Sequence, residues 1–180
     1  MKNTNPKVQV VKTIGHSTHP LDKLVAILQA HHVNQVIDIR KMPRSRSNPQ
    51  FNFETLGAEL GKCGIEYRHM PGLAGLRKVA KESLNTAWRN KSFQAFADYM
   101  QTEEFEKSIT ELMTLSNINE TALMCAEVLP WRCHRFLVAD ALTARGIAVQ
   151  HLMSEAKAYP HVMPDFALVT GTKVTYPLQT

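Results

Sequence analysis

The sequence predicts an α/β fold: a single three-layer domain over residues 1–180, with a mostly parallel sheet of about five strands between layers of helices. Two observations predict it. Short runs rich in β-branched residues alternate with longer segments whose apolar residues recur at helical spacing, and this alternation is typical of parallel sheets. The chain is also long enough for one substantial core, and it contains no linker, repeat or low-complexity segment.

The first half of the chain supplies three strands and two helices. β-Branched residues indicate the strands, and apolar spacing such as that of Leu21 and Leu28 indicates the helices. Thr18 or His19 is suited to cap the first helix, and Gly64 is suited to end the second. The expected elements are a strand at 8–14, a helix from Pro20 or Leu21 to about His32, a strand at 35–40, a helix at 53–63 and a strand at 65–70.

The second half adds helices and two further strands. Apolar residues within 77–116 predict two or three helices, with breaks near Asn90 and Thr102. The remaining expected elements are a buried strand at 121–127, a helix at 133–145 and a strand at 147–152. In the tail, the pair Gly171 and Thr172 between two short β-rich runs favours a type II′ turn, so a small hairpin is expected there.

Composition limits the compartment and the partners. Hydrophobic residues make up 44% of the chain and charged residues 21%, and no apolar run approaches the roughly 20 residues that cross a bilayer, so we expect no membrane partner. The start of the chain lacks the apolar core of a signal peptide, and Cys63, Cys125 and Cys133 lack a framework spacing. These features predict a cytoplasmic protein with free thiols. The formal net charge of +5 favours anionic partners, and the oligomeric state is left open.

Polar and ionisable residues follow every expected strand. Open α/β sheets bind ligands beyond the carboxyl ends of their strands. The residues at these ends are His16 and Ser17, Asp38 and Arg40, Arg68 and His69, Cys125 and Glu127, and His151. We therefore expect a shared site at this edge of the sheet. If the first and fourth strands are neighbours, one crevice is expected to be surrounded by His16, Ser17, Glu127, Arg132 and His134.

The segment CAEVLPWRCHR contains the candidate reactive groups. Glu127 is the preferred general acid or base, and its alternative is an ion pair with Arg132 or Arg135 that shapes the loop. Cys125 is expected to be a small core residue. Cys133 lies near an expected helix start and beside arginines, both of which favour a thiolate.

A strand-end cysteine followed by a loop, an arginine and a helix is also the arrangement of thiolate phosphatases and sulfurtransferases. The loop after Cys125 is one residue longer than the phosphatase loop and contains no glycine. It also contains Glu127, which disfavours a bound dianion, and Pro130, which lacks an N–H donor. Thiol chemistry is therefore an alternative rather than the leading hypothesis.

The segment GHSTH, residues 15–19, connects the first strand to the first helix. His16 is a candidate acid or base, and Ser17 is a candidate hydrogen-bond donor to an anion. The alternative is an ordinary turn in which Ser17 or Thr18 caps the helix. The histidines of this segment, together with Cys133 and His134, lack a recognised zinc spacing, so no metal site and no cofactor are predicted.

The segment DIRKMPRSR, residues 38–46, follows the second strand and contains a cluster of basic residues. Arg40 lies closest to the strand end and is the preferred pocket arginine, since arginine contacts phosphate oxygens through two donors. Arg44 and Arg46 extend the basic surface and are suited to a phosphodiester backbone. The alternative is a solvated basic loop without a partner.

Several motifs together resemble the DUF488 family of uncharacterised proteins. They are TIGHS at 13–17, DIRKMPRSR at 38–46, YRHMPGLAG at 67–75, FADYM at 96–100, CAEVLPWRCHR at 125–135, Gly146, His151 and VTYP at 174–177. The resemblance implies an α/β fold and no established activity. It implies that the signature positions are Gly15, His16, Ser17, Asp38, Arg40, Pro43, Arg46, Cys125, Glu127, Cys133, His134 and Arg135. Ala74 departs from the family, which often has two adjacent glycines there.

We therefore expect an intracellular enzyme that acts on a phosphate-bearing substrate, a nucleotide or nucleic acid. The candidate catalytic residues are Glu127, His16, His134 and Cys133. The candidate anion-binding residues are Ser17, Asp38, Arg40, Arg46, Arg132 and Arg135. Two alternatives stay open. One is a non-catalytic module that binds an anion or nucleic acid, and the other is a thiol-dependent phosphatase or sulfurtransferase-like enzyme.

Overall fold

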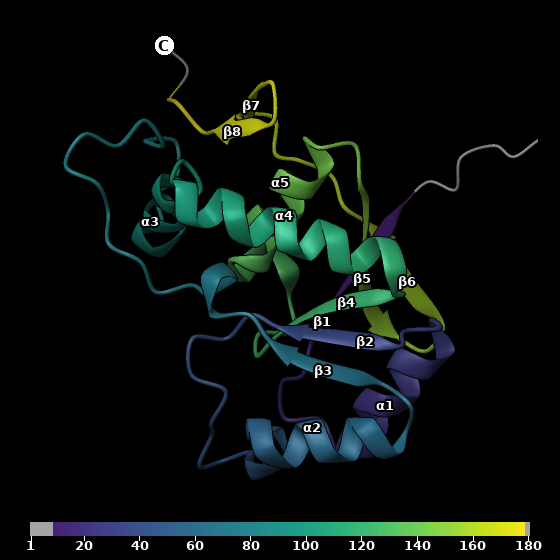
Figure 1. The fold of residues 1–180 in the computed structure, drawn as a ribbon. Coiled ribbons are helices and arrows are strands. Elements are labelled where there is room, and N and C mark those ends of the chain that lie inside the picture. Colours follow the sequence, from purple (N-terminus) through teal and green to yellow (C-terminus); the bar gives the residue numbers. More distant parts are fainter. Residues whose placement is uncertain (1–8, 179–180) are drawn as a thin grey trace, which may run out of the picture.

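The computed structural model describes residues 9–178, and its centre is a six-stranded sheet (Figure 1). The strands are β1 (Val10–Gly15), β2 (Gln35–Asp38), β3 (Glu66–His69), β4 (Thr121–Cys125), β5 (Ala148–Ser154) and β6 (Lys157–Pro160). Their order is β3-β2-β4-β1-β5-β6, and only β6 runs antiparallel to its neighbour. A separate antiparallel hairpin joins β7 (Leu168–Thr170) to β8 (Lys173–Thr175). The predicted fold class, with its C-terminal hairpin, is confirmed.

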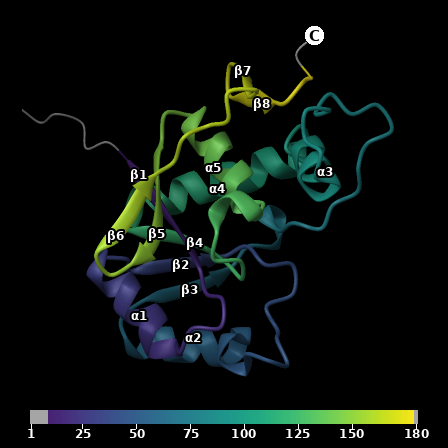
Figure 2. The same cartoon turned by 180° about the vertical axis from the view of Figure 1, so that it is seen from behind.

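Helices cover both faces of this sheet (Figures 1 and 2). One face carries α1 (Leu21–Ala30) and α2 (Phe53–Lys62). The other carries α4 (Glu103–Ile118) and α5 (Arg135–Thr143), with α3 (Lys91–Tyr99) packed beside them. Short 3-10 turns occur at η1 (Pro49–Phe51), η2 (Pro71–Leu73) and η3 (Pro130–Arg132). Within residues 9–178, no helix combines the length and the apolar character needed to cross a membrane.

The central strands are apolar on both faces because each face is covered. In β4, Leu123 packs into the core under α3, α4 and α5, whereas its neighbours Ala122 and Met124 pack under α1 and α2. In β1, Val11 packs into the core under α3, α4 and α5, and Ile14 packs under α1 and α2. Successive side chains of a strand point to opposite faces of the sheet because the strand is pleated. This alternation determines which side chains at the strand ends face each layer of helices.

Helices are present in each predicted region, with corrections at their starts. The region 77–116 contains two of them, and its first part, residues 77–90, is not helical. Asn90 and Thr102, the predicted breaks, are the N-caps of α3 and α4, and their side chains accept hydrogen bonds from the backbone. Neither Thr18 nor His19 caps α1, which begins after Pro20 without a side-chain cap. Proline lacks an N–H and has a fixed φ, so it suits a helix entry by itself.

The second helix-start correction concerns α5, which begins at Arg135 rather than Cys133. Residues 130–132 form the turn η3, and Cys133 itself is extended, with φ −130° and ψ 144°. The strand β6 was not predicted. The strand predicted at 8–14 begins at Val10 in the structure, and residue 8 lies outside the described residues.

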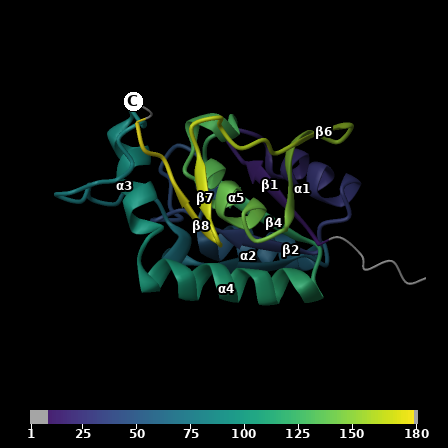
Figure 3. The same ribbon diagram turned by 90° about the horizontal axis from the view of Figure 1, so that it is seen from above.

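Strands β1 and β4 are neighbours whose connections leave in opposite directions (Figure 3). The chain leaves β1 through α1 toward β2, on the β3 side of the sheet. It leaves β4 through α5 toward β5, on the β6 side. Such a reversal is a topological switch point, where open α/β sheets bind ligands. The adjacency that the predicted crevice required is therefore present.

A buried chain of hydrogen bonds attaches the C-terminal segment to the sheet. Thr13 Oγ1 donates to His151 Nδ1 at 2.7 Å, and His151 Nε2 donates to His161 Nδ1 at 2.9 Å. His161 Nε2 then donates to Asp140 Oδ1 at 2.7 Å, while the Tyr176 hydroxyl donates to Asp140 Oδ2 at 2.5 Å. These directions follow because an ionised carboxylate only accepts and each neutral imidazole donates once. We refer to these five residues as the Asp140 network.

Candidate functional site

A pocket of about 610 Å³ opens at the carboxyl edge of β1 and β4, and we call it the switch-point pocket. Its lining comes from residues 16–18, 40–42, 44–45, 48, 75–76, 92–93 and 125–126 and from His134. Three cations line it, and none of its lining residues within the described chain is a carboxylate. A second pocket, of about 430 Å³, lies at the opposite edge of the sheet, and none of the described residues that line it is a histidine or a cysteine. The switch-point pocket is therefore the candidate site.

The turn after β1 lies directly against the turn after β4. The backbone N–H of His16 donates to the Cys125 carbonyl, and that of Ser17 donates to the Ala126 carbonyl, both at 2.9 Å. These bonds continue the parallel ladder beyond the strands. Gly15 permits the contact because a β-carbon there would lie only 2.7 Å from Val128 Cα. Two segments more than a hundred residues apart thus form one wall of the pocket.

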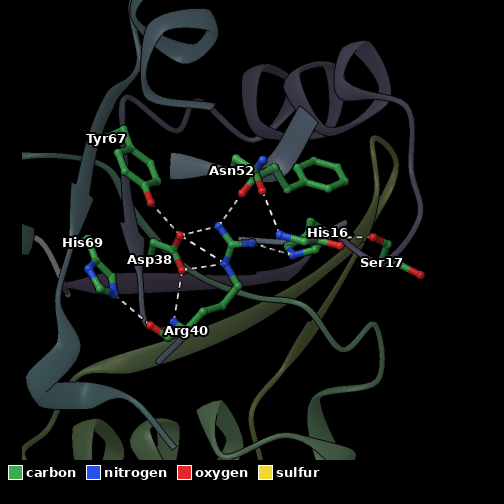
Figure 4. Close-up of polar contacts among 9 residues, drawn as sticks. His16, Ser17, Asp38, Arg40, Asn52, Tyr67 and His69 are labelled. Atoms are coloured by element: carbon green, nitrogen blue, oxygen red, sulfur yellow. Dashed lines mark hydrogen bonds and ion pairs between the residues drawn. The ribbon is translucent and has the colours of Figure 1, made fainter. Parts of the chain in front are cut away.

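Arg40 is the centre of a buried polar network (Figure 4). Its Nε and Nη2 donate to the Asp38 carboxylate, at 2.9 Å and 2.6 Å. Nη2 also donates to the Phe51 carbonyl, and Nη1 lies 3.2 Å from His16 Nε2. The Tyr67 hydroxyl donates to Asp38 at 2.6 Å. Burial works against the charge of Arg40, but its bonds to Asp38 outweigh this and raise its pKa.

His16 is held as a neutral imidazole. Its Nδ1 donates to the Ser17 carbonyl at 2.8 Å, which leaves Nε2 to accept from Arg40. The ring stacks on Phe51, with centroids 4.1 Å apart. Burial, with a smaller contribution from the charge of Arg40, lowers the pKa of His16 to about 4 despite the bond to Ser17. Both ring nitrogens are occupied, so the geometry does not favour His16 as an acid or base.

Cys125, Cys133 and His134 meet at the pocket floor, and we call them the thiol cluster. Their two sulfur atoms and one imidazole nitrogen all lie within 4.8 Å of one another. His134 Nε2 donates to the Ile39 carbonyl at 3.2 Å, so Nδ1 carries a lone pair, 3.7 Å from Cys133 Sγ. Cys125 and His134 line the pocket, while Cys133 lies behind them and is 5% exposed.

The two thiols of this cluster have different proton affinities. The hydrogen bond from Cys125 lowers the pKa of Cys133 to about 7, with help from the charge of Arg135 and against the effect of burial. The same bond, together with burial, raises the pKa of Cys125 well above its ordinary value. Cys133 is therefore the thiol that is most readily deprotonated, and Cys125 donates a hydrogen bond to it.

Glu127 and Arg135 shape the loop after β4 and lie outside the pocket lining. The Glu127 side chain is exposed and accepts a hydrogen bond from the Leu129 N–H at 3.2 Å. Arg135 is 1% exposed, and its amino groups donate to the carbonyls of Glu127 and Val128. The expected crevice is therefore corrected: it includes His16, Ser17 and His134 but not Glu127 or Arg132. The loop turns away from the pocket because its carbonyls are tied to Arg135.

The remaining predicted arginines lie on the surface. Arg132, in η3, and Arg46 are exposed and do not contribute to the lining. Asp38 is fully buried beneath Arg40 and is not in contact with the pocket either. The cations that reach the pocket with exposed side chains are Lys41 and Arg44.

Sequence reasoning missed part of this site. Lys41, Ser45 and Asn48 line the pocket, and so does Gly75. The first two belong to the basic segment that the sequence indicated. Within that segment Arg40 was preferred as the pocket residue, because it lies closest to the end of the strand. Cys125 was expected mainly as a core residue, with thiol chemistry as the alternative. It is in the core and also reaches the pocket, because its strand ends there.

The family described as "Domain of unknown function DUF488" matches residues 20–142, about two thirds of the chain. The matched region contains the basic segment, the thiol cluster and most of α5. No curated protein and no solved structure matches the chain.

Proposed function

The chain belongs to the DUF488 family, whose function is unknown, and we propose that it is an intracellular enzyme acting on a phosphate-bearing substrate, a nucleotide or nucleic acid. The observation that carries the proposal is the lining of the switch-point pocket. It combines cations and hydroxyl groups, and no carboxylate among the described residues lines it. Below them lies a cluster of two thiols and an imidazole.

Lys41 and Arg44 are the groups we assign to the phosphate. Both are exposed at the pocket lining. Arg44 forms an ion pair with Glu54 at 2.8 Å, but both side chains are more than half exposed. Such a pair contributes about 1 kcal/mol or less, so a bound phosphate competes with it readily. Arg40, the arginine preferred from the sequence, has its charge compensated by Asp38 and serves the framework.

Backbone strain also supports a site here. Ser17 has a φ of 46° and Leu76 a φ of 60°, and both residues line the pocket. A side chain in this left-handed region costs on the order of 1 kcal/mol, and such strain gathers at functional sites. The strained turn at Ser17 leaves its hydroxyl available to orient an anion.

We assign the chemistry to the thiol cluster instead of to Glu127 and His16. Glu127 lies outside the pocket lining, and both ring nitrogens of His16 are occupied. The cluster, by contrast, contributes Cys125 and His134 to the lining. Its imidazole carries a lone pair on Nδ1, which faces Cys133 Sγ at 3.7 Å and is suited to accept a proton or to bind a Lewis acid.

Ligand binding is tested first, by thermal shift against nucleotides, phosphosugars and short single and double strands. A ligand that binds the native state raises the melting temperature, and the shift should shrink in Lys41→Ala/Arg44→Ala. The matched control is Lys107→Ala/Lys157→Ala, which removes the same charge from exposed positions outside the lining. Equal shifts in both double variants, or no shift with any anion, contradict the proposal.

Catalysis is tested on the ligand class found in this way. We expect Cys133→Ser to bind the ligand while losing at least 100-fold in turnover, and Cys63→Ser, at an exposed position, to retain turnover. Binding without turnover in the unmodified protein would instead identify a non-catalytic anion-binding module.

A further inference from the structure

We propose that Cys125, Cys133 and His134 bind one zinc ion, whose fourth coordination position is open to the switch-point pocket. This inference goes beyond the proposed function, because the metal can be detected without a substrate. It also reverses the expectation, drawn from sequence spacing, that the chain has no metal site.

The distances fit a tetrahedral ion. All three donor atoms lie within 4.8 Å of one another, and Cys133 Sγ lies 3.7 Å from His134 Nδ1. A Zn–S bond of about 2.3 Å and a Zn–N bond of about 2.1 Å at the tetrahedral angle separate sulfur and nitrogen by about 3.6 Å. Cys133 and His134 are therefore already at the spacing of two ligands of one zinc ion, and Cys125 Sγ lies within 4.8 Å of both donor atoms.

The imidazole is already oriented as a ligand. His134 donates its Nε2 hydrogen to the Ile39 carbonyl, which leaves the Nδ1 lone pair directed to the sulfurs. A backbone carbonyl on the second nitrogen is the usual support of a metal-bound histidine. Gly75 packs against the same ring, since a β-carbon there would lie 2.9 Å from Nδ1. A side chain at this position would crowd the nitrogen that we assign to the metal.

The surrounding charge is compatible with a zinc site that has two thiolates. Arg135 is 1% exposed, and its Nε has no hydrogen-bond partner among the described residues. Its amino groups donate to the carbonyls of Glu127 and Val128, and no ion pair with a carboxylate is found for it within residues 9–178. A zinc ion with two thiolates and a neutral imidazole carries no net charge, so it can lie near this buried cation, whereas a ligand set with fewer thiolates would repel it.

The position of the cluster indicates which kind of zinc site this is. Cys125 and His134 line the pocket, so the side of the cluster that faces the cavity is left to water or substrate. Three protein ligands with an open fourth position are typical of catalytic zinc, and two cysteines with one histidine are one of the known sets. A zinc ion there would polarise a phosphoryl oxygen or activate a water molecule.

The test is a Co²⁺ titration of the full chain, purified without an affinity tag, stripped of metal and kept reduced. We expect one Co²⁺ per chain, with thiolate charge-transfer absorption and the ligand-field bands of a tetrahedral ion, both removed by one equivalent of Zn²⁺. Elemental analysis of the protein as purified should give one zinc per chain. X-ray absorption of the zinc form should give two sulfur neighbours and two nitrogen or oxygen neighbours.

Variants locate the site. Cys133→Ser and His134→Gln should each lower Co²⁺ affinity more than about 100-fold, because even a residue that only orients a ligand is worth 10–100-fold. Cys63→Ser, at the exposed cysteine, should leave the titration unchanged. The X-ray absorption measurement uses the unmodified chain, so it remains decisive if a variant does not fold.

Three results would overturn the proposal: no stoichiometric metal, a cobalt spectrum without thiolate absorption, or equal loss in the Cys63 variant. None of them depends on anion binding. A protein that binds zinc but no phosphate would contradict only the proposed function, and a protein that binds phosphate but no zinc would contradict only this inference.

Discussion

Asp38 and Arg40 form a buried ion pair at the end of β2, in which Arg40 Nη2 lies 2.6 Å from Asp38 Oδ2. The Asp38 side chain is fully buried and that of Arg40 is 7% exposed. The same carboxylate accepts the backbone N–H of Arg40 at 3.0 Å, so it also fixes the turn that leads into the basic segment. This pair supports the pocket wall, which Arg40 also lines.

Replacing Arg40 should therefore lower the stability of the folded protein. We expect Arg40→Ala to lower the free energy of unfolding by about 3–5 kcal/mol, because it leaves the Asp38 carboxylate buried without a cation. Urea unfolding measures this change. Arg46→Ala, at an exposed arginine of the same segment, should stay within about 0.5 kcal/mol of the unmodified protein. An equally small effect of Arg40→Ala would show that the pair does not stabilise the fold.

A substitution at Gly15 should separate the two turns that form the pocket wall. A β-carbon on Gly15 would lie 2.6 Å from the Glu127 carbonyl carbon and 2.7 Å from Val128 Cα, both in backbone. We expect Gly15→Ala to lower the free energy of unfolding, measured with urea, by at least about 2 kcal/mol, because neither turn can move without losing its hydrogen bonds. Gly61→Ala, in α2 with nothing within 4 Å of the new β-carbon, should instead stabilise by about 0.5–1 kcal/mol. A tolerated alanine at Gly15 would contradict the close approach.

The neutral state of His16 predicts a loss of stability in acid. Its folded pKa of about 4 lies below the ordinary 6.5, so the unfolded chain binds the extra proton first as the pH falls. The contribution of neutral His16 to the free energy of unfolding is therefore complete above about pH 6.5. It decreases toward pH 4, by roughly 3 kcal/mol in total. Urea unfolding at several pH values measures it. His16→Gln should show a shallower decrease, whereas His32→Gln, at an exposed histidine, should keep the slope of the unmodified protein.

The Asp140 network predicts a strong effect on stability at a position outside the pocket lining. Asp140 accepts from both His161 and Tyr176, and an asparagine there would turn an NH₂ group toward one of these donors. We expect Asp140→Asn to lower the free energy of unfolding, measured with urea, by about 2–4 kcal/mol. It should also increase hydrogen exchange in the segment around β8. Asp165→Asn, at an exposed aspartate, is the matched control, and equal effects of the two changes would refute the assignment.

Local signals in the sequence determined most of the secondary structure. The apolar strands, the caps at Asn90 and Thr102 and the turn at Gly171 all depend on residues within a few positions of one another. The same signals indicated the edge of the sheet at which the switch-point pocket opens, because polar residues follow each parallel strand. β6 was missed because it is a short edge strand that contains Pro160 and lacks an alternating pattern.

The α/β class, most of its elements and the edge of the sheet where polar groups gather could be predicted from local sequence patterns. Which of those groups meet depends on the tertiary structure. The order β2-β4-β1 brings Arg40 against His16, and the turn η3 returns the chain so that Cys133 and His134 lie beside Cys125. Glu127 and Arg132, equally prominent in the sequence, remain outside the pocket. The physical reason is that strand order and loop paths follow from packing among residues far apart in the chain, which the spacing of a motif does not record.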